Sequence, residues 1–137
     1  MKTAYRLGLT EVKGFAQTLA PELRGGETLA LMGELGSGKT TFTQALGKAL
    51  GVRQNILSPT FIVLQEFLTA KKTPGGQPVY LVHLDLYRTK NFSEVAALGL
   101  DQLWHQPQTI TVIEWADKIK QQLPPRTIAI YLTRDVS

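Results

Sequence analysis

A glycine-rich stretch, GELGSGKTTF at residues 33–42, carries the residue types that hold a phosphate group. Gly33, Gly38, Lys39 and Thr40 match the Gly-x-x-x-x-Gly-Lys-Thr pattern of a P-loop. Glycines let backbone N–H groups wrap an anion, the lysine ammonium reaches the β- and γ-phosphates, and the threonine hydroxyl can bind Mg²⁺. With average residue usage this pattern arises by chance in roughly 0.5% of chains of this length. The stretch therefore predicts nucleotide binding.

Two acidic residues are candidates for the second half of a metal site. Asp85 ends the apolar run VYLVHLD, and Glu114 ends the apolar run TITVIE. A P-loop enzyme needs an acid at the end of a neighbouring strand to hold the metal or its water shell, and ligands bind at that edge of such sheets. A helix cap or a surface acid would explain each residue too, and the sequence does not choose between the two acids.

A third clue is the segment SPTF at residues 58–61. Pro59 favours an extended conformation at Ser58, and Thr60 then follows on a loop or at the start of a strand. In GTPase-like proteins such a loop closes over the γ-phosphate and Mg²⁺. A plain turn into a strand is the alternative, and both remain open.

Two aromatic ring residues near these acids allow more than one interpretation. We predict that His83, in the middle of an apolar run, has a packed or hydrogen-bonded structural role. Trp115 directly follows Glu114 and belongs either to the core or to the nucleotide site or a partner surface.

Composition limits the class of protein. The 137 residues are 43% hydrophobic and 19% charged, which is typical of a globular fold, and we expect one domain over residues 1–137. There is no cysteine, no apolar run long enough for a spanning helix and no signal-peptide core, so we expect a cytoplasmic protein without membrane association. The net charge of +4 suits a nucleic-acid partner or an ordinary soluble surface.

Hydrophobic spacing predicts alternating strands and helices. Residues 9–23 have helical spacing with Thr10 as a possible N-cap, and the run at 27–32 has the composition of a buried parallel strand. Residues 39–50 form a second helix that ends at Gly51. Two strands around 58–67 and 79–86 form a hairpin with a long loop at 69–78, the segment we expect to be least ordered.

Further helical pieces are expected at 91–100, 101–106 and 116–123, with strands at 109–115 and 127–132. Together these elements predict an α/β protein with a three-layer P-loop NTPase-like fold and a mixed, mainly parallel central sheet.

Five segments taken together resemble the TsaE (YjeE) family, small bacterial ATPases of tRNA threonylcarbamoyladenosine biosynthesis. They are GELGSGKTTFTQALGKALG, SPTF, HLDLYR, ALGLDQL and VIEWAD, in an order and spacing that cover nearly the whole chain. The P-loop alone is shared by very many proteins, whereas SPTF, HLDLYR and IEW in this order are far more specific. The chain departs from the family at Ala116, where relatives usually have proline, and relatives also commonly continue beyond the last strand.

The resemblance implies binding and slow hydrolysis of ATP with Mg²⁺, beside the partner proteins TsaB and TsaD. It implies that Thr40 and Glu114 serve Mg²⁺, that Asp85 is a second active-site acid, and that Thr60 belongs to a switch-like loop. Thr10 would lie near the adenine. The residues expected to hold the nucleotide phosphates are Gly33, Gly36, Ser37, Gly38, Lys39, Thr40 and Thr41.

The function that these expectations favour is support of the machinery that makes N6-threonylcarbamoyladenosine at position 37 of tRNA, with tRNA contacted indirectly. A small-molecule P-loop kinase and a nucleotide-gated binding module without significant turnover are the alternatives. An Arg-rich lid typical of kinases is not apparent, and TKNF at residues 89–92 is not the base-reading tetrad of GTPases. We therefore expect ATP rather than GTP, and slow turnover by the protein alone.

Overall fold

A computed structural model describes residues 3–33, 37–56 and 64–134 of the chain. Its centre is a six-stranded sheet in the order β1-β6-β2-β5-β4-β3. All neighbouring strands are parallel except β3 and β4, which form an antiparallel hairpin at one edge. The strands are β1 (Thr3–Gly8), β2 (Thr28–Met32), β3 (Leu64–Lys72), β4 (Pro78–Asp85), β5 (Thr109–Glu114) and β6 (Ile128–Thr133).

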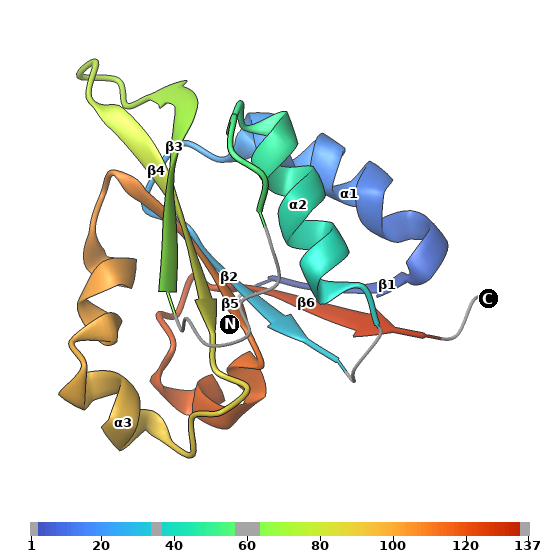
Figure 1. The fold of residues 1–137 in the computed structure, drawn as a ribbon, viewed down its shortest axis with the longest axis vertical. Helices are drawn as coiled ribbons and strands as arrows, with labels where there is room; N and C mark the ends of the chain where they lie inside the picture. The colour runs from blue at the N-terminus through green and yellow to red at the C-terminus, as the bar shows by residue number, and fades with distance from the viewer. Residues whose placement is uncertain (1–2, 34–36, 57–63, 135–137) are drawn as a thin grey trace.

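Helices cover both faces of this sheet, which gives the three layers seen in Figure 1. One face carries η1 (Leu9–Glu11), α1 (Val12–Leu19), η2 (Ala20–Glu22) and α2 (Lys39–Ala49). The other face carries α3 (Phe92–Ala97), η3 (Leu100–His105) and η4 (Ala116–Gln122). The predicted three-layer α/β fold with a mixed, mainly parallel sheet is confirmed.

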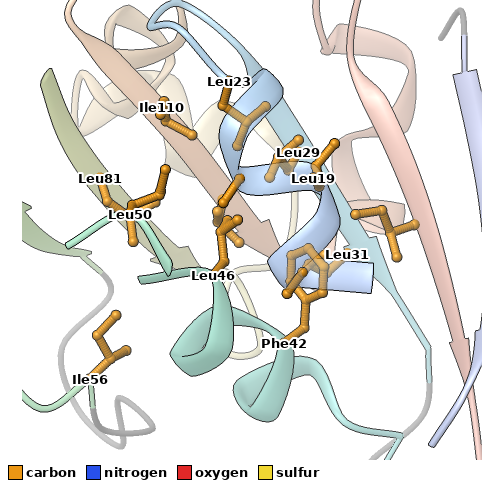
Figure 2. Packing of buried hydrophobic residues seen from close by; sticks show 14 of the residues in the cluster. Leu19, Leu23, Leu29, Leu31, Phe42, Leu46, Leu50, Ile56, Leu81 and Ile110 are labelled. Atoms are coloured by element: carbon orange, nitrogen blue, oxygen red, sulfur yellow. The ribbon is translucent and has the colours of Figure 1, made fainter. Parts of the chain in front are cut away.

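The core lies in two layers, one on each side of the sheet. Between the sheet and α1 and α2, Phe42 and Leu46 pack against Leu29 and Leu31 of β2 (Figure 2). Strands β2 and β5 are buried along their whole length, as central parallel strands covered on both faces should be. This packing fixes the carboxyl ends of β2, β4 and β5 relative to the start of α2.

Four details differ from the expectations. The strand β1 went unrecognised in TAYRLG, because it lies at the sheet edge and its exposed Tyr5 and Arg6 obscure an apolar pattern. Thr10 is not the N-cap of α1; Glu11 precedes that helix, and its Oε1 accepts a hydrogen bond from the Gly8 amide at 2.9 Å.

The hairpin loop is also shorter than expected, because β3 continues to Lys72 and pairs with Pro78. Residues 73–76 make a tight turn with Pro74 and Gly75 at its centre, in which the Gly76 amide donates to the carbonyl of Thr73 at 2.8 Å. Residues 116–122 form a kinked 3-10 segment rather than a regular helix, with Ile119 outside helical backbone angles.

No helix in the described ranges combines the length and apolar character needed to cross a membrane.

Candidate nucleotide-binding site

Two glycines shape the loop between β2 and α2. Gly33 has φ +154°, and a Cβ there would lie 2.4 Å from the carbonyl oxygen of Leu132 and 2.7 Å from Oγ of Ser37. Gly38 has φ +102° and directly precedes α2. Both positions require a residue without a side chain, so the two outer glycines of the motif are explained by backbone geometry.

Lys39 is the first residue of α2 and is buried, with 6% of its surface exposed. Its Nζ donates a hydrogen bond to the carbonyl oxygen of Gly33 at 2.6 Å and lies 3.5 Å from Oγ of Ser37. The same nitrogen lies 4.0 Å from the ring centre of Trp115. The ammonium group is therefore kept within the loop that the sequence assigns to phosphate.

The first turn of α2 presents the other predicted phosphate and metal ligands. Thr40 and Thr41 are half-buried there, and the free N–H groups of a helix start attract anions. Gly38 lies against Leu9 and Val12, since a Cβ on Gly38 would be 3.4 Å from each of their side chains. The segment η1, which contains the exposed Thr10, is thus beside the phosphate loop.

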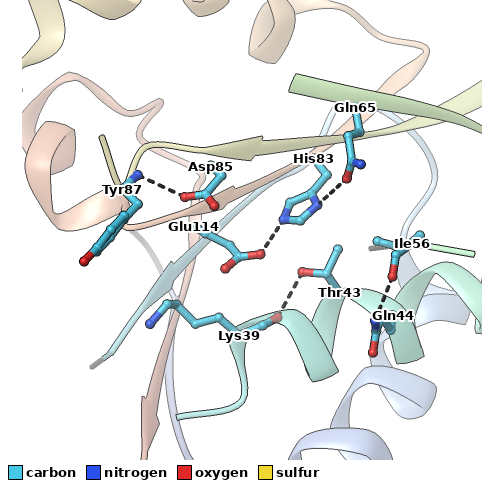
Figure 3. A network of polar contacts seen from close by, with 9 residues as sticks. All are labelled: Lys39, Thr43, Gln44, Ile56, Gln65, His83, Asp85, Tyr87 and Glu114. Atoms are coloured by element: carbon cyan, nitrogen blue, oxygen red, sulfur yellow. Dashed lines mark hydrogen bonds and ion pairs between the residues drawn. The ribbon is translucent and has the colours of Figure 1, made fainter. Parts of the chain in front are cut away.

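Asp85 and Glu114 end neighbouring parallel strands and are direct register partners, so both side chains lie on the same face of the sheet. That face is the one covered by α2, because Val112, two residues before Glu114, packs in the α1–α2 core. Glu114 is buried, with 4% exposed, whereas Asp85 is half-buried. The structure therefore brings both predicted acids to the edge of the sheet where α2 begins (Figure 3).

The two acids have different surroundings. Burial raises the pKa of the Asp85 carboxyl, and the nearby Glu114 carboxylate raises this pKa further. Opposing this, the backbone N–H of Tyr87 donates to Oδ1 of Asp85 at 2.9 Å, and His83 and Lys39 also act to lower the pKa. Asp85 is thus a carboxyl group that the site makes easier to protonate.

Glu114 contacts a partner that the motif did not predict. Its Oε2 is bonded to Nε2 of His83, which is completely buried. The other ring nitrogen of His83 lies 3.3 Å from Oε1 of Gln65 (Figure 3). The prediction of a hydrogen-bonded role for His83 is confirmed, but its link to a candidate metal ligand was missed. The spacing His83-x-Asp85, which puts both residues on one strand face, was the available signal.

Trp115 has an unusual backbone, with φ +61°. A non-glycine residue in this left-handed region typically costs about 1–3 kcal/mol, so its surroundings must hold it there. Lys39 lies over its ring, and the ring of Tyr87 packs against it with centres 5.1 Å apart. Trp115 therefore packs at the edge of the core and against Lys39 at the same time, and its contact with a nucleotide or a partner stays a prediction.

Lys118 fixes the loop that follows Asp85. Its Nζ donates to the carbonyl oxygens of Leu86, Tyr87 and Thr89 at 2.9, 2.5 and 2.8 Å. This bridge ties the turn after β4 to η4, which begins directly after Trp115. Neither the P-loop pattern nor the acids indicated it, since it depends on two segments about 30 residues apart.

The donor chemistry of this edge fits Mg²⁺. Asp85, Glu114 and Thr40 offer only carboxylate and hydroxyl oxygens, the ligand type that Mg²⁺ prefers. Across the described ranges, no group of three or more His, Cys, Asp or Glu residues could hold a metal alone. Mg²⁺ is generally bound by one or two carboxylates together with substrate phosphates and water. Two predicted site residues, Gly36 and Thr60, lie outside the described residues.

Comparison with known proteins relates the chain to a single protein family. The family model for threonylcarbamoyl adenosine biosynthesis protein TsaE matches residues 8–137. A TsaE protein of Bacillus subtilis is 38% identical over 124 residues, covering 90% of this chain and 72% of the relative. A TsaE protein of Synechocystis is 40% identical over 110 residues, covering 78% of this chain and 65% of the relative.

The fold comparison agrees. The crystal structure of YdiB from Bacillus subtilis superposes with a TM-score of 0.66 at 31% identity, covering 96% of this chain and 75% of that one. The relatives carry the name tRNA threonylcarbamoyladenosine biosynthesis protein TsaE. On this match of nearly the whole chain, the protein belongs to the TsaE family.

Proposed function

We propose that this chain binds ATP with Mg²⁺ at the loop between β2 and α2 and hydrolyses it slowly. In this role it supports the TsaB–TsaD machinery that makes N6-threonylcarbamoyladenosine at position 37 of tRNA. The observation that carries the proposal is the placement of the buried Lys39 ammonium beside Gly33 and Ser37, next to the acids that end β4 and β5.

In this proposal the phosphates lie in the loop before α2, held by backbone N–H groups and by Lys39. Lys39 leaves the carbonyl of Gly33 for the β- and γ-phosphate oxygens, a charge-assisted contact stronger than the one it replaces. Thr40 and Glu114 would hold Mg²⁺, which would neutralise phosphate charge when bound. Thr10 on η1 lies on the adenine side.

In this proposal Glu114 and Asp85 have different roles. Glu114 is buried and fixed by His83, which suits a group that must present one oxygen at a constant position. Asp85 is more exposed and has a raised pKa, which suits a group that orients the attacking water and takes up its proton.

These two roles predict different variants. Glu114→Gln should weaken Mg²⁺-dependent ATP binding, whereas Asp85→Asn should slow hydrolysis while Mg·ATP binding stays near wild type. Calorimetry at fixed Mg²⁺ together with phosphate release measures both. If Asp85→Asn instead loses the metal dependence and Glu114→Gln only slows turnover, the two roles have been exchanged.

The biological role is tested in cells. We expect cells whose only copy of this protein carries Lys39→Ala to lose N6-threonylcarbamoyladenosine from tRNA, as measured by mass spectrometry of digested tRNA. A Lys48→Ala copy is the control, since Lys48 is exposed at the far end of the same helix. Normal modification with the Lys39→Ala copy would contradict the proposal. ATP-dependent phosphorylation of a metabolite by the purified protein would favour a kinase instead.

A further inference from the structure

His83 and Glu114 form a buried pair at the centre of the site. Nε2 of His83 meets Oε2 of Glu114, with 0% and 4% of the two residues exposed. An ionised carboxylate in such a place needs a donor, because an unpartnered buried charge is strongly destabilising. With Glu114 ionised, the imidazole N–H supplies this donor, so His83 determines where one of the two carboxylate oxygens lies.

Gln65 holds the other side of the same ring. It is the direct cross-strand partner of His83 in the β3–β4 hairpin, and its Oε1 lies 3.3 Å from Nδ1 of His83. A glutamine amide can offer either its oxygen or its nitrogen, so it can serve the ring tautomer that leaves a hydrogen on Nε2. The ring is therefore held from both nitrogens, and its plane is fixed relative to β5.

Strand register brings Gln65, His83 and Glu114 together near the edge of the sheet where β5 ends. Gln65 pairs with His83, His83 pairs with Val112, and Glu114 lies two residues further along β5 on the same face. The three polar side chains thus come from three adjacent strands and contact one another in sequence, from Gln65 through His83 to Glu114 (Figure 3). Beside His83 on this face lie Leu81 and Val112 of the core, and His83 itself is completely buried, so water cannot replace its ring without opening this packing.

We propose that Gln65 and His83 are positioning residues for the metal-binding carboxylate. By taking up Oε2 of Glu114 they leave Oε1 as the single oxygen directed at Mg²⁺, and they hold it in one rotamer before the metal arrives. This inference rests on the proposed function, because it assumes that Glu114 serves the metal. Outer partners that orient a metal ligand typically change metal affinity or activity by about 10- to 100-fold when removed.

Three substitutions test this arrangement. His83→Leu fills the space without a donor, and His83→Gln keeps an N–H group that can reach the place of Nε2. Thr69→Val is the control: Thr69 is also buried on β3 and donates to the carbonyl of Val79 at 2.7 Å, remote from Glu114. ATP affinity is measured by calorimetry with Mg²⁺ and again with EDTA, so that the gain due to Mg²⁺ is separated from phosphate binding itself.

We expect His83→Leu to lower the Mg²⁺-dependent gain in ATP affinity by about tenfold or more, with affinity in EDTA near wild type. His83→Gln should restore most of the gain, and Thr69→Val should keep it. If His83→Leu does not fold, Gln65→Leu takes its place and should show a smaller loss in the same direction. The proposal would be overturned if His83→Leu kept the wild-type gain in ATP affinity from Mg²⁺. It would also be overturned if His83→Gln or Thr69→Val lost as much of this gain as His83→Leu does.

Crystal structures of the wild type and the two His83 variants without nucleotide give a readout independent of ATP. Glu114 should keep its rotamer in His83→Gln and change it in His83→Leu. An unchanged rotamer in His83→Leu refutes positioning even where ATP binding is normal. Absence of ATP binding by the wild type would instead refute the proposed function, and the rotamer comparison would then decide this inference alone.

Discussion

At the scale of single residues, Lys39 places a positive charge at the start of α2, beside Gly33 and Ser37. Its Nζ has the Gly33 carbonyl at 2.6 Å and the Trp115 ring at 4.0 Å as neighbours, so the side chain is already ordered near the proposed phosphate position. An ordered ammonium loses little conformational freedom when an anion binds. Its contribution to affinity is therefore the gain of a charge-assisted phosphate contact over the Gly33 contact that it replaces, with little loss of conformational freedom.

Lys39→Ala should weaken ATP binding by roughly ten- to a hundredfold. A hydrogen bond to a charged group contributes about 1.5–3 kcal/mol, and each 1.4 kcal/mol is about tenfold in affinity. Titration calorimetry with ATP and Mg²⁺ measures the change, and Lys48→Ala on the same helix should bind as wild type. Equal affinity of Lys39→Ala and wild type would remove the P-loop from the account.

Asp85 gives a pH-dependent prediction. Burial, then Glu114, raises its pKa above the usual 3.8, despite the opposing effects of the Tyr87 N–H, His83 and Lys39. The folded protein thus binds this proton more tightly than the unfolded chain, so ionised Asp85 destabilises the fold at neutral pH, and this penalty fades as pH falls through the folded pKa.

Asp85→Asn keeps the acceptor for the Tyr87 amide but carries no charge. Thermal unfolding in EDTA should therefore show Asp85→Asn more stable than wild type at pH 7. Its advantage should shrink toward zero near pH 3.8, where the wild-type carboxyl is itself protonated. A variant that is less stable than wild type at pH 7 would show that the ionised carboxylate makes a favourable contact after all.

Some features of the loop before α2 follow from local rules that can be read in the sequence. Gly33 and Gly38 are required by backbone geometry within one loop, and Lys39 follows them directly. The role of His83 could not be predicted in the same way. It depends on strand register, which places Gln65 opposite it and Glu114 beside it from segments far apart in the chain.

At the scale of elements, the turn after β4 and the segment η4 act as one unit around Trp115. Lys118 bonds three carbonyls of that turn, and Tyr87 packs its ring on Trp115. This unit lies directly after Asp85 in one segment and after Glu114 in the other. It therefore supports both acids, and it explains how Trp115 is held in a left-handed conformation.

Lys118→Met keeps most of the aliphatic stem but removes the three hydrogen bonds. Because the side chain is exposed and water can replace part of the loss, we expect destabilisation of about 1–2 kcal/mol, near the lower end for charged hydrogen bonds. Faster hydrogen exchange should appear at the Thr89 amide, which donates to the Leu86 carbonyl at 3.0 Å.

The matched control is Lys13→Met, an exposed lysine on α1. It should leave both unfolding and exchange near wild type. Unchanged exchange at Thr89 in Lys118→Met would mean that packing of Tyr87 on Trp115 holds the turn without the lysine.

Element prediction succeeded where hydrophobic spacing is strong and failed at edges and turns. The central β2 and β5 were recognised as apolar runs, whereas β1 lies at the sheet edge with Tyr5 and Arg6 exposed. The hairpin loop was overestimated because exposed lysines near its tip, such as Lys72, belong to the strand. A charged residue on an exposed strand position resembles a loop residue when only the sequence is read.

At the scale of the whole molecule, the arrangement of the layers determines which groups of the proposed site come from this chain. The sheet supplies Asp85 and Glu114, and α2 supplies Lys39 at its first position. The predicted phosphate loop directly precedes α2, and η1 lies beside Gly38 of that loop. Efficient P-loop hydrolysis also uses an arginine finger that can contribute about 10³–10⁵ in rate, often from a partner. Arg88, exposed on the turn three residues after Asp85, is a candidate for this role within the chain itself.

We therefore expect a protein that binds ATP alone but turns it over slowly until its partners complete the site. If the partners favour the ATP-bound form, ATP must tighten partner binding by the same factor, because coupling between two binding events is reciprocal. The predicted switch-like role of Thr60 stays a prediction, since that residue lies outside the described ranges.

The most direct measurement is phosphate release from ATP and Mg²⁺ by the purified protein, first alone and then with the TsaB–TsaD pair, with and without tRNA. Lys39→Ala in the same mixtures is the control that assigns the activity to this site. We predict slow release by the protein alone, clear stimulation by the pair, and loss of the stimulated rate in Lys39→Ala. Fast release by the protein alone that the pair leaves unchanged, or a stimulated rate that survives Lys39→Ala, would contradict it.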